Sequence, residues 1–520
     1  MTAEIRPRRL AAAGSLAHAV LGGEGPTSLP RVSALDPSAL PPPRESRLGP
    51  EAFGSSGPET RRRLEAVLRG EGYFVSTGHQ PVLLLGPLYV VYKVLTAISL
   101  AARLERTLGR PVVPLVWVAA DDHDWAEVGR ATLLDRSDEP HELVLPVPEG
   151  AGRRSVGSHL IDQELLRAIG DLSEILPESD FAPHYLKSIQ NAYSEGRTLS
   201  EAFAGLLREV LGDRGYVWID SVRPEIRRAA VPLMRRLLDH WDGALEAQAA
   251  GARALTEAGF EAPIAAVEGA LPLFFDGGEG RRRIRPGAEE SLRGWRERLE
   301  TEPDGFSPNV ASRPVLESFL LPVAATALGP GEIAYWSQLR PLFDFLDVRM
   351  PLIQPRAAWT LIEPRVRRTL ARAEISPQDL AAGAEPVVVR LTREARPETV
   401  NRALRRFREE AEARLAEVEQ AVADKLPGLR GTAGKTRKNV LNAADDLSRQ
   451  VDRMTRQRLD VRVGQVRRAA ASLFPGRRPQ ERVLNPFPFL CRYGPELIDR
   501  LAHETDAGVA ASLAGAGTDG

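Results

Sequence analysis

The sequence predicts an α/β fold: an open, mostly parallel sheet with helices on both faces, followed by a long antiparallel α-helical hairpin. Two observations predict the sheet, namely continuous apolar runs typical of strands buried on both faces and helix-like segments that alternate with them. A third observation predicts the hairpin. From about residue 393 the composition changes to Arg, Glu and Ala, without another buried-strand pattern before the end of the chain.

The first part of the predicted sheet is a strand, a helix and a second strand. A short strand is expected in "YFVSTGHQ" (73–80), a long helix in 86–109, and a buried strand in "PVVPLVWVAA" (111–120). The pattern returns in 207–221, where a helix leads into a strand, and in 350–362, which predicts a later strand. In an open parallel sheet, ligands bind at the carboxyl ends of the strands.

The length of the chain predicts a core with additional segments. At 520 residues, the chain exceeds the size at which one hydrophobic core keeps growing. We expect an N-terminal arm with an irregular Pro-rich stretch (29–50), a core with two insertions, a helical hairpin, and a C-terminal segment that returns to the core and ends in a flexible tail. The predicted bounds are 1–71 for the arm, 72–392 for the core with insertions near 131–200 and 225–300, 393–475 for the hairpin and 476–520 for the last segment.

Apolar residues of the predicted hairpin form two stripes, and those of the first have the three- to four-residue spacing of one helix face. The first stripe is Val400, Leu404, Phe407, Ala411, Leu415, Val418, Val422 and Leu426, and the second is Val440, Leu447, Val451 and Met454. The sequence "LPGLRG" (426–431) separates them. Two helices bury little apolar surface by themselves, so we expect a coiled-coil arm that forms a homodimer; packing on the protein's own body is the alternative.

Charge and cysteine content exclude several classes of protein. The 69 basic and 70 acidic residues give a formal net charge of −1, which argues against non-specific nucleic-acid binding. Cys491 is the single cysteine, which excludes an intramolecular disulfide and a Cys-rich zinc site; its apolar context, "FPFLCRYG", predicts a packed residue. No apolar run is long enough for a membrane span, and the N-terminus is too weakly apolar for a signal peptide. We therefore expect a cytoplasmic protein.

An Asp-His cluster, "AADDHDWAEV", directly follows the predicted strand 111–120. His123 can act as an acid or base near neutral pH, and Asp122 or Asp124 can orient it or bind a metal or an ammonium group. Capping of the next helix is the alternative for one Asp, but it does not explain three carboxylates around a histidine. We predict that His123, Asp122 and Asp124 are catalytic.

Two other segments supply candidate residues for binding a substrate or nucleotide. The turn "STGHQ" (76–80) precedes a helix, and "LGPGE" (328–332) opens another helix; glycine lets backbone approach a ligand, and helix N-termini attract anions. Glu332 is a candidate for binding an amine. An ordinary turn and packed aromatics are the alternatives, and no GxxxxGK[ST] motif is present. The candidate residues are Thr77, Gly78, His79, Gln80, Asn309, Arg313, Gly329, Gly331, Glu332, Tyr335, Trp336 and Gln338.

Six ordered motifs resemble those of the bacterial bacillithiol synthase family, the cysteine ligases, from about residue 72 to 503. The motifs are "TGHQPVLLLGPLYVVYK", "PLVWVAADDHDWAEV", "SPNVASRPVLESFLLP", "GPGEIAYWSQL", "MPLIQPR" and "PQERVLNPFPFLCRYGPELIDRL". The resemblance implies a Rossmann-type core related to nucleotidylyl transferases, inserted connecting peptides and a dimeric coiled-coil arm. It also adds Arg356, the last residue of "MPLIQPR", to the candidate binding residues.

The resemblance further implies the last step of bacillithiol assembly, in which L-cysteine is joined through its carboxyl group to the amine of glucosaminyl malate. A carboxylate must be activated before it forms an amide at neutral pH, for example as an adenylate or acyl phosphate. ATP with magnesium is the candidate cofactor, while the nucleotide and any metal stay open. Nucleotidyl transfer with another product and a non-catalytic scaffold are the alternative functions.

Overall fold

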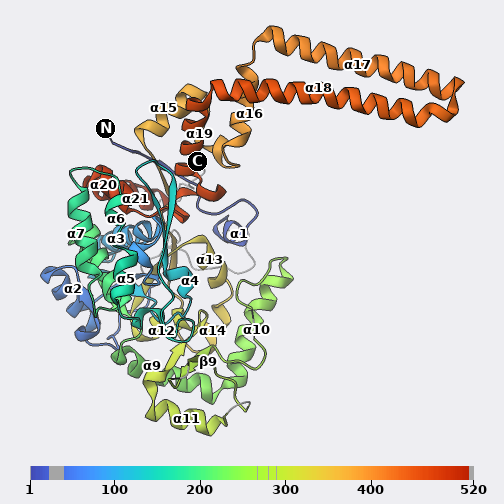
Figure 1. Ribbon diagram of the computed structural model, residues 1–520. Coiled ribbons are helices and arrows are strands. Elements are labelled where there is room, and N and C mark those ends of the chain that lie inside the picture. The colour runs from blue at the N-terminus through green and yellow to red at the C-terminus, as the bar shows by residue number, and fades with distance from the viewer. Residues whose placement is uncertain (1, 23–39, 266, 279, 288–289, 514–520) are drawn as a thin grey trace. The chain divides into compact units, whose positions relative to one another are not determined.

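The computed structural model describes residues 2–22, 40–265, 267–278, 280–287 and 290–513 (Figure 1). The chain divides into two compact units. The larger consists of Ile5–Leu361 and Gln480–Gly520, and the smaller of Met1–Glu4 and Ile362–Pro479. The predicted flexible tail (514–520) and residues 29–39 of the Pro-rich stretch lie outside the described residues.

A six-stranded sheet forms the centre of the larger unit, in the order β12-β11-β3-β4-β7-β2. Its strands are β2 (Gly54–Ser55), β3 (Tyr73–His79), β4 (Val112–Val118), β7 (Val217–Asp220), β11 (Val323–Leu328) and β12 (Leu352–Pro355). All neighbours are parallel except β2 and β7. The parallel strands, numbered along the chain, have the order 3-2-1-4-5, which is that of a Rossmann fold. The predicted open, mostly parallel sheet is confirmed.

Helices cover both faces of the sheet, which explains the continuous apolar runs of the sequence. Val113, Leu115 and Trp117 of β4 belong to one apolar cluster, and Val116 and Val118 belong to another. Helices α2 (Pro58–Leu68), α9 (Pro224–Asp239) and α12 (Ser312–Leu320) contribute to the first cluster, and α3 (Tyr89–Leu108) and α8 (Leu199–Leu211) to the second. Because side chains alternate across a strand, a strand covered on both faces is apolar throughout.

The structure corrects three details of the predicted core. The segment 350–362 contains two strands, of which only β12 joins the central sheet; the other is β13 (Trp359–Ile362). Strand β11 was not predicted, because its "VAATAL" sequence has few of the β-branched and aromatic residues typical of strands. The predicted N-terminal arm, 1–71, also contains strand β2 and helix α2, which belong to the core of the larger unit.

Two long connections surround the sheet. Between β4 and β7 lie α4 (Trp125–Val128), β5 (Arg130–Leu134), β6 (Pro140–Val144), α5 (Gln163–Ala168), α6 (Leu172–Ile175) and α7 (Ala182–Ala192). Between β7 and β11 lie α10 (Trp241–Glu257), α11 (Leu292–Thr301) and a small sheet of β8 (Leu273–Asp276), β9 (Arg281–Arg283) and β10 (Phe306–Pro308). Both connections contribute residues near the carboxyl end of β4, as described below.

The C-terminal segment packs in the larger unit through α20 (Phe487–Tyr493) and α21 (Glu496–Leu513). Helix α21 lies against α3, where Asp506 accepts a hydrogen bond of 2.8 Å from Ser99. Cys491 is buried in an apolar cluster, and burial raises the pKa of its thiol to about 12. The prediction that Cys491 is a packed residue is confirmed.

The smaller unit consists of α15 (Pro364–Ala373), α16 (Glu385–Glu394), α17 (Glu398–Lys425), α18 (Arg430–Arg458) and α19 (Asp460–Leu473). Helices α17 and α18 form a long antiparallel hairpin (Figure 1), with the turn in the predicted "LPGLRG" segment. Its apolar stripes remain partly uncovered, since Phe407, Val418, Leu447 and Met454 keep 49% to 58% of their surface exposed. Among the described helices, none is both long enough and apolar enough to cross a membrane.

Candidate functional site

The predicted site residues lie at the carboxyl edge of the central sheet. The ends of β3 and β4 are in register, with His79 opposite Val118. Strand β11 pairs with the other side of β3, so the order of the strands reverses between β3 and β11. Open α/β sheets bind ligands at such a point, in the crevice beyond the strand ends.

Gln80 connects the turn after β3 to the Asp-His cluster after β4. Its side-chain amide donates a hydrogen bond of 2.5 Å to Asp122 Oδ2 and another of 3.2 Å to Glu127. The other oxygen of Asp122 accepts the backbone N–H of His123 at 2.7 Å and lies 3.6 Å from His123 Nδ1. The His123 side chain is 44% exposed, so its ring is accessible beside a fixed carboxylate.

The three aspartates of this cluster have different roles. Asp124 caps α4 by accepting the backbone N–H of Glu127 at 3.1 Å, which is the alternative that the sequence left open for one Asp. Asp121 is buried and forms an ion pair with Arg227 of α9. Asp122 is therefore the carboxylate that contacts the His123 ring, and the structure assigns Asp124 a local structural contact.

A buried charge network lies between β3 and β11. Lys93, on α3, has a side chain that is 3% exposed; its ammonium donates to the carbonyl of Gly78 and forms an ion pair of 2.8 Å with Glu332. Glu332 also accepts the backbone N–H of Gly329 at 2.8 Å, at the start of α13 (Pro330–Trp336). The carboxylate thus binds an amine, as predicted for Glu332, but the amine belongs to Lys93 of the same chain.

Burial determines the ionisation of this network. It lowers the pKa of Lys93, although the Glu332 carboxylate opposes the shift. Burial alone would raise the pKa of Glu332, but Lys93 and the Gly329 N–H more than offset it and the net shift is downward. Burial, followed by the Lys93 charge, lowers the pKa of His79 to about 4. His79 is therefore neutral at pH 7, with its ring nitrogens 2.9 Å from the Gln80 carbonyl and the Tyr89 hydroxyl.

Arg313 adds a second buried ion pair next to Gly78. Its guanidinium contacts Glu317 at 2.7 Å and interacts with Tyr335. An added side-chain carbon at Gly78 would lie 3.5 Å from the Arg313 guanidinium, so the turn and α12 are close neighbours. The predicted residues Gly78, His79, Gln80, Arg313, Glu332 and Tyr335 are thus brought together at one edge.

Several other predicted binding residues have structural contacts instead. Thr77 donates to the carbonyl of Ala327 at 3.0 Å, and Asn309 accepts backbone N–H groups at the start of α12. Trp336 is buried in the core, and Gln338 hydrogen-bonds both backbone groups of Ile264. Arg356 forms a buried ion pair of 2.8 Å with Glu481. Thr77, Gln338 and Arg356 pointed to ligand binding in the sequence because their partners are distant along the chain.

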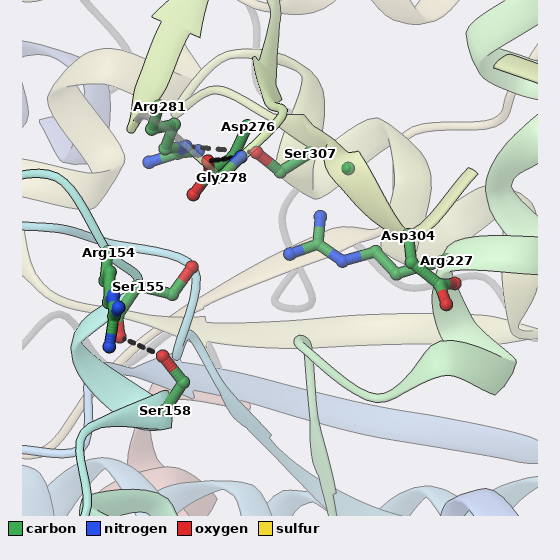
Figure 2. A pocket seen from close by; sticks show the side chains of 10 residues that line it. Arg154, Ser155, Ser158, Arg227, Asp276, Gly278, Arg281, Asp304 and Ser307 are labelled. Atoms are coloured by element: carbon green, nitrogen blue, oxygen red, sulfur yellow. Dashed lines mark hydrogen bonds between the residues drawn. The ribbon is translucent and has the colours of Figure 1, made fainter. Parts of the chain in front are cut away.

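A polar pocket of about 360 Å³ lies beside the Asp-His cluster (Figure 2). Its wall contains Arg154, Ser155, Ser158, Arg227, Arg281 and Ser307, with Asp276 and Asp304. The pocket adjoins the cluster at two places, since Arg227 pairs with Asp121 and the backbone N–H of Val156 donates to the carbonyl of Asp122 at 2.6 Å. The sequence did not predict it, because the pocket combines residues from four separate segments, 154–158, 227, 276–281 and 304–307.

The structure does not define a metal site from side chains alone. Within the described ranges, no group of three or more His, Cys, Asp or Glu side chains is arranged to hold a metal ion. Metal binding by Asp122 or Asp124 stays a prediction from the sequence.

Asp220 is a further buried carboxylate that sequence analysis missed. It ends β7, opposite Val118 of β4, and accepts the backbone N–H of Val222 at 3.1 Å. Burial, with a smaller effect of Asp121, raises the pKa of Asp220 to about 6. The only signal in the sequence is an Asp at the end of the strand "VWID".

Replacing Asp220 with asparagine is expected to change the pH dependence of stability. Because the folded protein binds this proton more tightly than the unfolded chain does, wild-type stability from this group falls as pH rises from about 4 to about 6. Above pH 6, this decrease in the free energy of unfolding amounts to at most about 3 kcal/mol. His79 acts in the opposite direction in nearly the same window, so the difference between variant and wild type isolates Asp220.

Thermal unfolding of wild type and Asp220→Asn between pH 4 and pH 8 checks this prediction. The variant should gain stability relative to wild type as pH rises. A constant difference across the range would show that Asp220 ionises at its ordinary pKa.

Comparison with known proteins agrees with this architecture, which defines a Rossmann-like domain joined to a coiled-coil domain. Residues 50–357 match the family model described as "Bacillithiol biosynthesis BshC, N-terminal Rossmann-like domain", and residues 359–508 match "Bacillithiol biosynthesis BshC, C-terminal coiled-coil domain". The chain belongs to this bacillithiol biosynthesis family, as its motifs indicated.

Relatives from different bacteria extend over most of the chain, and each has the name "Putative cysteine ligase BshC". The protein of Salinibacter ruber is 32% identical and aligns over 85% of this chain and 83% of its own length. The protein of Symbiobacterium thermophilum is 30% identical and aligns over 84% of this chain and 82% of its own length. The protein of Anoxybacillus flavithermus is 28% identical and aligns over 86% of this chain and 85% of its own length.

Proposed function

We propose that this protein is a ligase that joins the carboxyl group of L-cysteine to the amine of glucosaminyl malate, in the last step of bacillithiol assembly. The observation that carries the proposal is the His123 side chain, which is 44% exposed and has its Nδ1 3.6 Å from Asp122, at the strand edge of a protein of this family. The adjoining polar pocket provides room for a substrate. The cytoplasmic location expected from the sequence is part of the same proposal.

In this reaction, the amine attacks an activated carboxyl group and must lose a proton. The exposed imidazole of His123 is the group we assign to accept that proton, with Asp122 as the residue that orients it. Asp124, as the cap of α4, holds the loop in place. ATP with magnesium is the proposed source of activation, because a carboxylate must be activated before it forms an amide at neutral pH.

Mass spectrometry of the full-length protein with glucosaminyl malate, cysteine, ATP and magnesium tests the proposal. We expect a product with the mass of the condensed amide, absent when ATP is omitted. A nucleotidylated product without an amide would favour the alternative of nucleotidyl transfer. Absence of any product from folded protein would favour the non-catalytic scaffold.

We also propose that the hairpin of α17 and α18 pairs with that of a second copy. The support is the row of half-exposed apolar residues on both helices. Exposing apolar surface to water is unfavourable, and a second hairpin would cover these residues. Changing Phe407 and Leu447 together to aspartate is expected to convert a dimer to a monomer in light scattering at micromolar concentration. A wild-type monomer, or a dimer that persists in the variant, would contradict the proposal.

A further inference from the structure

The polar pocket contains an arginine without a carboxylate partner. Arg281 of β9 donates to Ser307 Oγ at 3.0 Å and to the carbonyl of Pro308 at 2.7 Å, and its guanidinium stacks on the Phe274 ring at 4.0 Å. Within the described parts of the chain, Arg281 forms no ion pair. Burial lowers the pKa of Arg281, although Asp121 opposes the shift, so the cation is partly desolvated without direct contact with an anion. An anionic ligand would supply that contact.

Arg227 presents a second buried guanidinium to the same space. It is held by the Asp121 carboxylate and by the carbonyl of Phe306 at 2.5 Å, while its Nε is buried without a hydrogen-bond partner among the described residues. Figure 2 shows this guanidinium reaching into the pocket from the side opposite Arg154. Asp121 thus positions Arg227. This contact gives a role to the carboxylate of the cluster that does not contact His123.

Among the described residues, neither acidic side chain of the wall forms an ion pair with these arginines. Asp276 accepts the backbone N–H groups of Gly278 and Gly280, at 2.9 and 3.2 Å, and is thereby fixed in its own turn. Asp304 is exposed. Arg154 is also exposed, and its charge is available to a ligand that enters the pocket.

We propose that this pocket binds the two carboxylates of the malyl group of the substrate, an inference that rests on the proposed function. Arginine binds carboxylates through paired hydrogen bonds, and the three arginines come from different elements around the space (Figure 2). A four-carbon dicarboxylate has two separate anionic ends that can meet different arginines. The hydroxyls of Ser155 and Ser307 supply additional donors for the carboxylate oxygens.

The pocket also lies close to His123, as binding of the malyl group requires. Phe274 contacts Arg281 on β9 and approaches the His123 ring, with ring centres 6.4 Å apart. A malyl group bound to Arg281 would therefore lie near the His123 imidazole, which we propose accepts the proton of the substrate amine. Arg281 would then bind the substrate, and the neighbouring His123 would accept the proton.

Calorimetric titration of the full-length protein with L-malate, glucosaminyl malate and inorganic phosphate tests the inference. We expect Arg281→Gln to weaken the binding of both malyl compounds roughly tenfold or more. Arg282→Gln is the matched control, because it removes the same charge from the next residue of β9, whose side chain lies over Phe275 and Trp295. The control should bind like wild type.

Three results would overturn the inference: wild type that binds neither malyl compound, equal binding by wild type and Arg281→Gln, or phosphate that displaces L-malate with equal affinity through Arg281. If Arg281→Gln does not fold, the exposed Arg154→Gln variant takes its place, with weaker malyl binding expected. Arginine-dependent malate binding without any amide product would support the pocket and contradict the ligase proposal. Amide formation that is unaffected by Arg281→Gln would support the ligase proposal and contradict the malyl pocket.

Discussion

Replacing His123 with alanine is expected to lower the rate of amide formation by about 100-fold or more, the usual size of a general acid-base contribution. His123 contacts Asp122, but its side chain is 44% exposed and contributes little to the core. The substitution should therefore leave the melting temperature nearly unchanged. The rate of product formation by mass spectrometry and the unfolding curve together check the prediction.

His184 provides a matched control for this experiment. It lies on α7, is 60% exposed, and pairs with the Glu209 carboxylate at 3.3 Å, so it is another surface histidine beside an acid. His184→Ala should react at the wild-type rate. Full activity of His123→Ala would show that another group accepts the proton, whereas equal losses in both variants would indicate a general effect on folding.

The strand character of the buried apolar runs and the position of the Asp-His cluster at a strand end could be predicted because they depend on local sequence. A continuous apolar run such as 111–120 is possible only where both faces of a strand are covered, and polar residues after it must lie at the strand end. The Gly-rich start of α13 was recognised for the same reason. Its capping carboxylate, Glu332, is three residues from the backbone group that it binds.

The contacts that decide the role of each residue could not be predicted from the same patterns. Asp121, Asp122 and Asp124 are nearly equivalent in the sequence, but partners at 227, 80 and 127 give them three different roles. Lys93 gave one neglected signal. It interrupts the apolar helix segment "VVYKVL", and a lysine on a buried face requires a partner, here Glu332, 239 residues away.

The pocket was missed because its arginines looked like ordinary surface charge. The "RRR" of β9 stands in a chain whose basic and acidic residues are nearly equal in number, and total charge does not show where a cation lacks a counter-ion. Alternation along the strand places Arg281 and Arg283 on one side, over Phe274, and Arg282 on the other. Three adjacent arginines thus have two different environments.

Replacing Glu332 with glutamine is expected to destabilise the larger unit by about 3 kcal/mol or more at pH 7, because the Lys93 ammonium then stays buried without a counter-charge. Glutamine keeps the shape of the side chain and one acceptor for the Gly329 N–H. The loss therefore reports on charge, and the melting temperature of this unit should fall by roughly 3–5 °C. Glu297→Gln, which breaks an exposed ion pair with Arg293, is the control and should cost less than about 1 kcal/mol.

The pH dependence of Glu332→Gln distinguishes a buried charge from a simple loss of packing. Burial already lowers the pKa of Lys93, and without the carboxylate its folded pKa falls further below that of the unfolded chain. Stability then rises with pH through that interval, so the deficit of the variant should shrink between pH 7 and pH 9.5. The double variant Lys93→Met with Glu332→Gln removes the charge altogether and should recover most of the loss at pH 7. A deficit that is the same at both pH values and persists in the double variant would show that shape, and not the ion pair, makes this edge of the sheet stable.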